Sequence, residues 1–291
     1  MIKIKKYSLI IIGLTFLCTT QFIAIKVQER FSSFNECSRW GRVAESFRSE
    51  KEVSFWGSST CQLGVYPPVF TQTTGKTSEN FGITGLYFDQ QFHLDLFTER
   101  NKGKTIMWVV NPYEYTLPHK KTVELSTFLP FALDPSIKER LGLPLTSYIG
   151  AKYLFQLDAK HWKLLLGAPV EKSNCEQGHI TQEFSYCERG SLYNKELKLI
   201  KEKTDHLLKL GDKITPNNSL VFLIPPNAIK EQKQFVVEFE KELKKNGFIV
   251  WNFATNIAYK DTSLFQDELH LNAVGAKKWS KEIGNLFLTL D

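Results

Sequence analysis

Two continuous apolar runs of strand length limit the folds open to this chain. Thr105 to Val110 (TIMWVV) and Leu220 to Ile224 (LVFLI) have the pattern of strands in a parallel sheet that is covered on both faces. Three further strand candidates are Glu52 to Trp56, Ser78 to Phe81 and Phe248 to Phe253. Segments of helical periodicity separate these runs. The sequence therefore predicts an α/β fold, a three-layer structure around a parallel sheet.

Apolar residues at helical spacing predict the positions of the helices. One is predicted from Gly85 to Arg100 and another from Tyr148 to Leu166. A third is expected to end at Gly211, and a fourth to end at Gly247. The last helix, at about 273–288, is predicted to place four residues on one side: Ala276, Trp279, Ile283 and Leu286. Between Gln62 and Phe70, two adjacent prolines, Pro67 and Pro68, are expected to limit any helix.

The stretch from about residue 112 to 190 breaks this rhythm. It contains repeated prolines and several aromatic residues. Long irregular segments inside compact domains are usually functional, so we expect an insertion that forms a lid or a partner surface. The predicted organisation is a basic stub and anchor at residues 1–30, followed by one domain at residues 31–291 that carries this insertion.

The N-terminal segment predicts export. Lys3, Lys5 and Lys6 precede 19 uncharged residues, Tyr7 to Ile25, a length that can just span a bilayer as a helix. A cleaved signal peptide has a similar pattern and remains the alternative. The positive-inside rule places the lysines in the cytoplasm. We therefore expect a single N-terminal transmembrane helix and a domain on the periplasmic or cell-surface side, and both alternatives export that domain.

The net charge of +6 does not indicate a nucleic-acid partner. Half of the excess comes from the three N-terminal lysines, and no basic stripe interleaved with aromatic residues is found. No nucleic-acid partner is expected.

Four cysteines lie outside the N-terminal apolar segment, an even number that suits an oxidising compartment. Cys175 and Cys187 lie 12 residues apart in a polar stretch typical of a stapled loop, which would leave Cys37 to pair with Cys61. Two other pairings remain open. Zinc at Cys175, His179 and Cys187 is the competing interpretation, but a fourth ligand at compact spacing is missing, so no metal site is expected.

Two polar blocks follow predicted strands, and the carboxyl ends of parallel strands meet at one sheet edge. Gly57-Ser58-Ser59-Thr60 follows the first strand. Asp267 and His270 lie three residues apart before the last helix, a spacing at which the carboxylate can orient the imidazole. Together the blocks supply a nucleophile, a base and an orienting group, although a turn and a helix cap would explain each block alone.

These blocks resemble the SGNH (GDSL-like) hydrolase superfamily. The likeness is greatest to its exported, membrane-anchored bacterial group, which includes the SGNH domains of alginate O-acetyltransferases and the D-alanyl transfer protein of lipoteichoic acid. The C-terminal block is the more specific of the two. The resemblance implies a flavodoxin-like fold with Ser59 as nucleophile, His270 as base and Asp267 as orienting residue, and Ser58 is the alternative nucleophile.

The resemblance also implies an oxyanion hole made by Ser59 N–H, Gly82 N–H and the Asn111 side chain, although the residues around Asn111 depart from the family pattern. The implied activity is ester hydrolysis or O-acyl (acetyl) transfer through an acyl-serine, without a cofactor. The expected partners are a cell-surface polysaccharide or acylated polymer and a membrane-bound O-acyltransferase. The alternative is a non-catalytic SGNH scaffold that binds polysaccharide or docks to such an acyltransferase.

Overall fold

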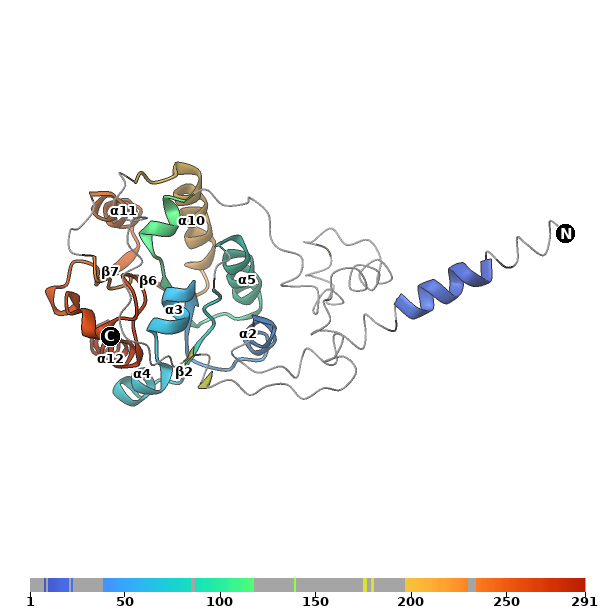
Figure 1. Ribbon diagram of the computed structural model, residues 1–291, viewed down its shortest axis with the longest axis horizontal. Helices are drawn as coiled ribbons and strands as arrows, with labels where there is room; N and C mark the ends of the chain where they lie inside the picture. Colours follow the sequence, from blue (N-terminus) through green and yellow to red (C-terminus); the bar gives the residue numbers. More distant parts are fainter. Residues whose placement is uncertain are drawn as a thin grey trace. The chain divides into compact units, whose positions relative to one another are not determined.

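The computed structural model describes residues 8, 10–20, 22, 39–84, 87–117, 139, 175–176, 179–180, 197–229 and 234–290 (Figure 1). The chain divides into two compact units. One comprises Met1–Ala44 and Glu124–Lys172, and the other comprises Glu45–Val123 and Ser173–Asp291. The second unit contains the whole parallel sheet and every catalytic residue expected from the sequence.

The second unit is built on a five-stranded sheet in which every strand pair is parallel. Its strands, in the order β2-β1-β3-β6-β7, are Ser78–Asn80, Val53–Gly57, Thr105–Val109, Ser219–Ile224 and Ile249–Asn252. Each lies within one or two residues of a predicted strand, so the prediction of an α/β fold with a parallel sheet is confirmed. The order reverses between β1 and β3, which is where ligands bind in sheets of this kind.

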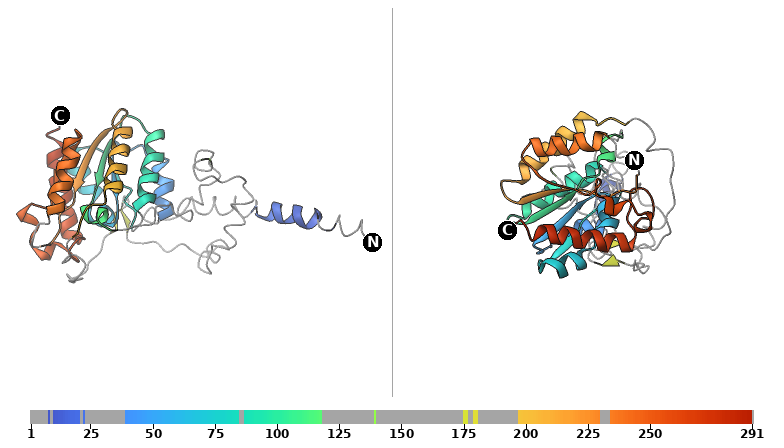
Figure 2. Two further views of the ribbon diagram at one scale, coloured as in Figure 1. Left: turned by 90° about the horizontal axis from the view of Figure 1, so that it is seen from above. Right: turned by 90° about the vertical axis from the view of Figure 1, so that its left-hand side faces the viewer.

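Along β1, β3 and β6, successive side chains point alternately into two apolar layers. Trp56, Trp108 and Phe222 belong to one buried cluster, whereas the neighbouring residues on the same strands belong to the other. Helices α5 (Tyr87–Arg100), α10 (Lys201–Ile214) and α11 (Gln234–Lys245) cover the first face. Helices α3 (Ser59–Gly64), α4 (Pro67–Thr74) and α12 (Ala273–Phe287) cover the other (Figure 2). The result is a three-layer sandwich.

Two local predictions about helix ends are wrong. Helix α10 runs through Gly211 to Ile214. Gly211 is a packing residue, because a Cβ there would lie 2.7 Å from the Phe248 ring. Pro67 and Pro68 do not prevent a helix but begin α4, since the first turn of a helix needs no amide hydrogen from either position.

The predicted buried face of α12 is correct except at its end. Ala276, Trp279 and Ile283 are fully buried, but Leu286 is 37% exposed and Phe287 takes its place in the core. The step of four from Ile283 keeps Phe287 on the helix face that contacts the sheet.

Several predictions fall on other parts of the chain. Residues 10–20 are helical, and among the described residues no helix is both long and apolar enough to cross a membrane. Of the predicted insertion, Pro112–Tyr115 forms the 3-10 helix η1. Cys175–Glu176 (β4) pairs antiparallel with His179–Ile180 (β5), which lies beside α3. The predicted helix at 148–166, Cys37 and Cys187 lie outside the described residues, so the Cys175–Cys187 bridge stays a prediction.

Candidate active site

Three residues from the two predicted blocks meet at the carboxyl edge of the sheet. The Ser59 Oγ atom lies 2.7 Å from His270 Nε2. His270 Nδ1 lies 2.8 Å and 2.9 Å from the two carboxylate oxygens of Asp267. Because Nδ1 faces a carboxylate, it carries the hydrogen, and Nε2 is left to accept the proton of the serine. The arrangement can activate a hydroxyl nucleophile.

The two adjacent serines have different contacts. Ser59 is the first residue of α3, and its hydroxyl faces His270. Ser58 is the N-cap of α3: its Oγ accepts a hydrogen bond from Thr60 N at 3.4 Å and lies 3.1 Å from Thr60 Oγ1. The structure therefore brings Ser59, and not Ser58, to the imidazole.

Gly57 makes the sharp turn between β1 and these serines. Its φ is +146°, a backbone conformation that side chains rarely adopt. A Cβ at this position would lie 2.5 Å from Val109 O on the neighbouring strand. Ser59 can therefore follow β1 this closely only because the residue is glycine.

The loop that carries Asp267 and His270 closes on itself. Asp267 Oδ1 accepts hydrogen bonds from Leu269 N at 3.0 Å and from His270 N at 2.9 Å. An isolated antiparallel bridge between Phe265 and Leu271 closes the loop, and Gln266 N donates to His270 O. The spacing of three thus lets one carboxylate hold both the backbone and the imidazole of His270.

The Asp267 side chain is nearly buried, with 4% of its surface exposed. Burial alone would raise its pKa, but the hydrogen bond and charge of His270, together with the two amides, hold the pKa below its ordinary value. Asp267 is therefore ionised at neutral pH and can stabilise a protonated His270.

Helix α12 fixes the position of this loop. Asn272 caps the helix, its Oδ1 accepting from Val274 N and Gly275 N. A Cβ on Gly275 would lie 2.1 Å from Leu264 O, so glycine permits the close approach of the loop to the helix. Gly64 in α3 likewise packs against the Trp279 ring of α12. Helix α3, which begins at Ser59, and helix α12, which follows His270, are thus in direct contact.

Gly82, an expected oxyanion donor, is engaged elsewhere in this structure. Its N–H donates to Asn80 Oδ1 at 2.9 Å. The Asn80 amide nitrogen in turn donates to Cys61 O and Val65 O at the end of α3. Asn80 thus joins β2 to helix α3, a role that sequence reasoning missed.

Cys61 is a buried thiol that donates to Asn80 Oδ1 at 3.3 Å, and its Cβ packs closely against Gly57 and Gly82. The predicted Cys37–Cys61 bridge stays a prediction, because Cys37 lies outside the described residues.

Asn111, the other expected oxyanion donor, follows β3 and is buried. Its Oδ1 accepts from Tyr113 N at 3.2 Å and caps η1. No hydrogen bond of its amide nitrogen falls among the described residues, so that nitrogen is the part of Asn111 able to serve an oxyanion.

Glu114 in η1 is a charged residue of the site that sequence reasoning did not single out. Its side chain hydrogen-bonds with Ser58 and interacts electrostatically with His270 and Lys203. Burial raises its pKa to about 7, although these three contacts oppose the rise. Burial also lowers the pKa of Lys203 to about 8, and the charge of Glu114 limits that decrease. The only available signal in the sequence was its position just after a strand.

No protein-family model matches the chain, and no curated protein is significantly similar to it. Among the described residues, no cluster of His, Cys, Asp and Glu could hold a metal ion. Of the other histidines, His93 is completely buried and bonds with Ser46 at 2.6 Å, as expected for a structural role.

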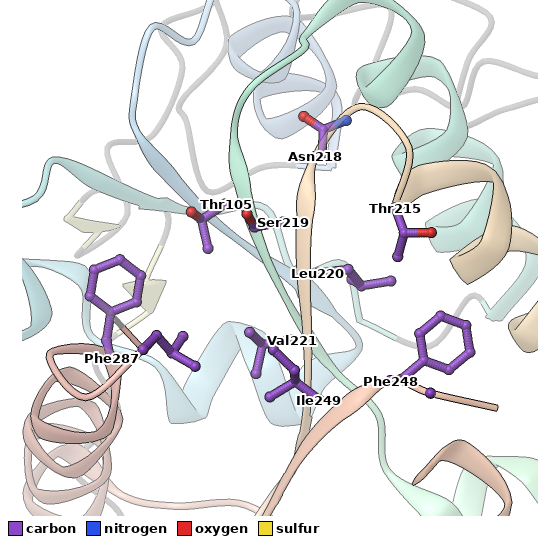
Figure 3. A pocket seen from close by; sticks show the side chains of 11 residues that line it. Thr105, Thr215, Asn218, Ser219, Leu220, Val221, Phe248, Ile249 and Phe287 are labelled. Atoms are coloured by element: carbon purple, nitrogen blue, oxygen red, sulfur yellow. The ribbon is translucent and has the colours of Figure 1, made fainter. Parts of the chain in front are cut away.

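A groove of about 430 Å³ lies away from these residues, at the amino ends of the strands. Thr105, Ser219 and Ile249, the first residues of β3, β6 and β7, line it. Figure 3 shows Phe287 and Phe248 on either side of the groove. Because it opens at the opposite sheet edge, it does not belong to the site around Ser59.

Proposed function

We propose that this protein is a serine-dependent esterase or O-acyltransferase with Ser59, His270 and Asp267 as its catalytic residues. The single observation that supports this most strongly is the continuous contact from Ser59 Oγ to His270 Nε2 and from His270 Nδ1 to the Asp267 carboxylate. A strand order of 2-1-3-4-5, counted along the sheet strands, also fits the proposed flavodoxin-like SGNH fold.

The proposed reaction has two balanced steps. Ser59 Oγ attacks the ester carbonyl carbon while His270 Nε2 takes its proton. The ester C–O bond then breaks, and His270 returns the proton to the leaving alcohol, so that an acyl-serine remains. In the second step, water or an acceptor hydroxyl attacks the acyl carbon and gives its proton to His270. The bond between the acyl carbon and Ser59 Oγ then breaks, and His270 returns the proton to Ser59 Oγ. Water as acceptor makes the protein an esterase, and a sugar hydroxyl makes it a transferase.

The oxyanion of each tetrahedral intermediate needs hydrogen-bond donors. Ser59 N–H lies in the first turn of α3, where amides have no partner within the helix. The Asn111 amide nitrogen can add a second donor. Gly82 N–H contributes only if its bond to Asn80 Oδ1 opens when substrate binds. We therefore assign the first two as the donors of the unliganded site and Gly82 as a conditional third.

The proposed setting is the cell surface. An anchor at residues 7–25 would hold the domain on the extracytoplasmic side of a membrane, with an ester-bearing polysaccharide or another acylated polymer as substrate. A membrane-bound O-acyltransferase is the proposed source of acyl groups in the transfer reaction. This assignment depends on the charge pattern of the N-terminal sequence and on the family resemblance.

Covalent labelling tests the proposed function. A serine-reactive phosphonate should label the wild type at Ser59, and Ser59→Ala should abolish both labelling and turnover of 4-nitrophenyl acetate. Ser58→Ala is the matched control, because it removes an adjacent hydroxyl that does not face His270; it should still be labelled. Unchanged labelling of Ser59→Ala would overturn the assignment.

One observation favours the non-catalytic scaffold as a second candidate: the expected oxyanion donor Gly82 N–H is already bonded. A scaffold would bind acetylated polysaccharide equally well before and after Ser59→Ala and would resist phosphonate labelling. Binding measured by calorimetry beside the labelling experiment separates these two functions.

A further inference from the structure

Glu114 is held at the active site by the packing of its neighbours. Tyr113 packs edge-on against Phe235, with 5.0 Å between ring centroids, and Tyr115 packs against Phe239 at 4.7 Å. Both tyrosines are buried in the layer between the sheet and α11. Glu114 lies between them in the sequence and is only partly buried, on the side of η1 that faces Ser58 and His270.

The backbone around Glu114 is fixed as well. Lys203 Nζ of α10 donates to Glu114 O at 2.6 Å and also to Leu117 O. Ile200 N donates to Tyr115 O at 2.8 Å. A backbone bonded at Glu114, Tyr115 and Leu117 to Ile200 and Lys203 cannot easily withdraw the carboxyl from the site. The position of Glu114 is therefore a consequence of the fold and not of a freely rotating surface chain.

The carboxyl meets three groups. Ser58 hydrogen-bonds to it, and the charged residues that face it are His270, from the loop before α12, and Lys203, from α10. Helix α11 meets η1 through the aromatic residues Phe235 and Phe239. The Ser58 oxygen also accepts from Thr60 N, so the residue that interacts with the Glu114 carboxyl also caps the helix that begins at Ser59.

We propose that Glu114 is a positioning residue of this active site: its carboxylate fixes Ser58 beside the nucleophile and presents a negative charge to protonated His270. The inference rests on the proposed function. A negative charge near His270 stabilises the imidazolium that forms when the serine loses its proton. Glu114 would thus act together with Asp267, which contacts the other ring nitrogen.

The proposal has a consequence for pH dependence. A carboxyl whose pKa is about 7 is protonated in mild acid and ionised in mild base. Only the ionised form carries the charge that stabilises the imidazolium. Activity should therefore rise as pH passes through the pKa of Glu114, which is about 7.

Glu114→Gln tests the charge while keeping a hydrogen-bond acceptor for Ser58. With 4-nitrophenyl acetate, we expect kcat to fall about tenfold at pH 8 and far less at pH 5.5, with KM nearly unchanged. The rise of activity around pH 7 should become smaller in this variant. Glu238→Gln is the matched control, because Glu238 is an exposed carboxylate on α11; it should leave both kcat and the profile unchanged.

A second measurement does not require turnover. The ¹³C resonance of the Glu114 carboxyl, assigned by its absence in Glu114→Gln, should titrate near pH 7. Ser58→Ala should raise that midpoint, because the Ser58 hydrogen bond favours the ionised form. Titration near the ordinary value of a glutamate, with no response to Ser58→Ala, would overturn the inference.

The outcomes distinguish the two proposals. If Ser59 is labelled but Glu114→Gln keeps the wild-type rate and profile, the inference on Glu114 is wrong and the proposed function stands. Equal losses in Glu114→Gln and Glu238→Gln would also refute it, because the effect would then be general. If Ser59 is never labelled, the proposed function fails and takes the catalytic role of Glu114 with it.

Discussion

Gly57 offers a direct test of how closely the position of Ser59, the proposed nucleophile, depends on backbone geometry. Gly57→Ala would add one methyl group at the end of β1, directly before Ser58 and Ser59. The new Cβ would lie 2.5 Å from Val109 O, 3.0 Å from Cys61 Cβ and 3.1 Å from Val109 Cβ, at a residue whose φ is +146°. Three contacts and an unfavourable backbone conformation therefore act at one position.

The size of the effect follows from these distances. Real Cβ contacts are essentially never shorter than 3.0 Å, so β1 and β3 must separate by roughly half an ångström. Backbone strain costs about 1–3 kcal/mol, and overpacking costs about as much again. We expect the free energy of unfolding to fall by about 2–5 kcal/mol. Because Ser59 moves with the turn, kcat should fall about 10- to 100-fold.

Gly75→Ala is the matched control. Gly75 ends α4 with φ +73°, and a Cβ there would meet nothing within 4 Å. This variant carries backbone strain without a steric clash, so it should lose about 1–2 kcal/mol and keep its activity. Urea unfolding gives both stabilities, and initial rates on 4-nitrophenyl acetate, corrected for the folded fraction, give both activities.

The reasoning fails if the two alanine variants lose the same stability and both remain fully active. That result would mean that the sheet accommodates the methyl group at Gly57 without moving Ser59, so the approach of β1 to β3 would not determine where the nucleophile lies.

Three further variants test other contacts. Asp267→Asn should lower kcat by about 10³- to 10⁴-fold. Because folding lowers the pKa of Asp267, its ionised carboxylate stabilises the protein fully above about pH 4, and this stabilisation is lost as pH falls through the pKa of the folded state. Urea unfolding from pH 7 to 3 should therefore show a smaller decrease of the unfolding free energy in Asp267→Asn than in the wild type. Gly211→Ala should destabilise the protein by about 1–3 kcal/mol, measured by urea unfolding, because its Cβ would lie 2.7 Å from the Phe248 ring; an unchanged stability would contradict the assigned packing role. Asn272→Ala should cost about 1 kcal/mol through loss of the α12 cap, and thermal unfolding that matches the wild type would refute that role.

The strands could be predicted because their pattern depends on local sequence. A strand covered on both faces must be apolar at every position, and Thr105–Val109 and Ser219–Ile224 meet that condition nearly throughout. The Asp267–His270 loop could also be predicted, since its contacts lie within four residues along the chain. Both features depend only on residues that are close together in the sequence.

Features that depend on distant partners could not be predicted. Glycine often ends a helix, but Gly211 instead leaves room for the ring of Phe248, which lies 37 residues away in the sequence. Glu114 reaches the site because aromatic residues of α11 and hydrogen bonds from Ile200 and Lys203 hold η1 in place. In each case the deciding neighbour belongs to another element.

The contact between Ser59 and His270 joins residues that are 211 positions apart. Closing so long a chain costs conformational entropy that only the assembled layers can offset. Phosphonate labelling of Ser59 is therefore also a probe of tertiary folding: during urea unfolding, reactivity should disappear in the same transition as the near-ultraviolet signal of the buried tryptophans. A variant that is labelled at the wild-type rate can be taken to have its sheet, α3 and α12 correctly assembled.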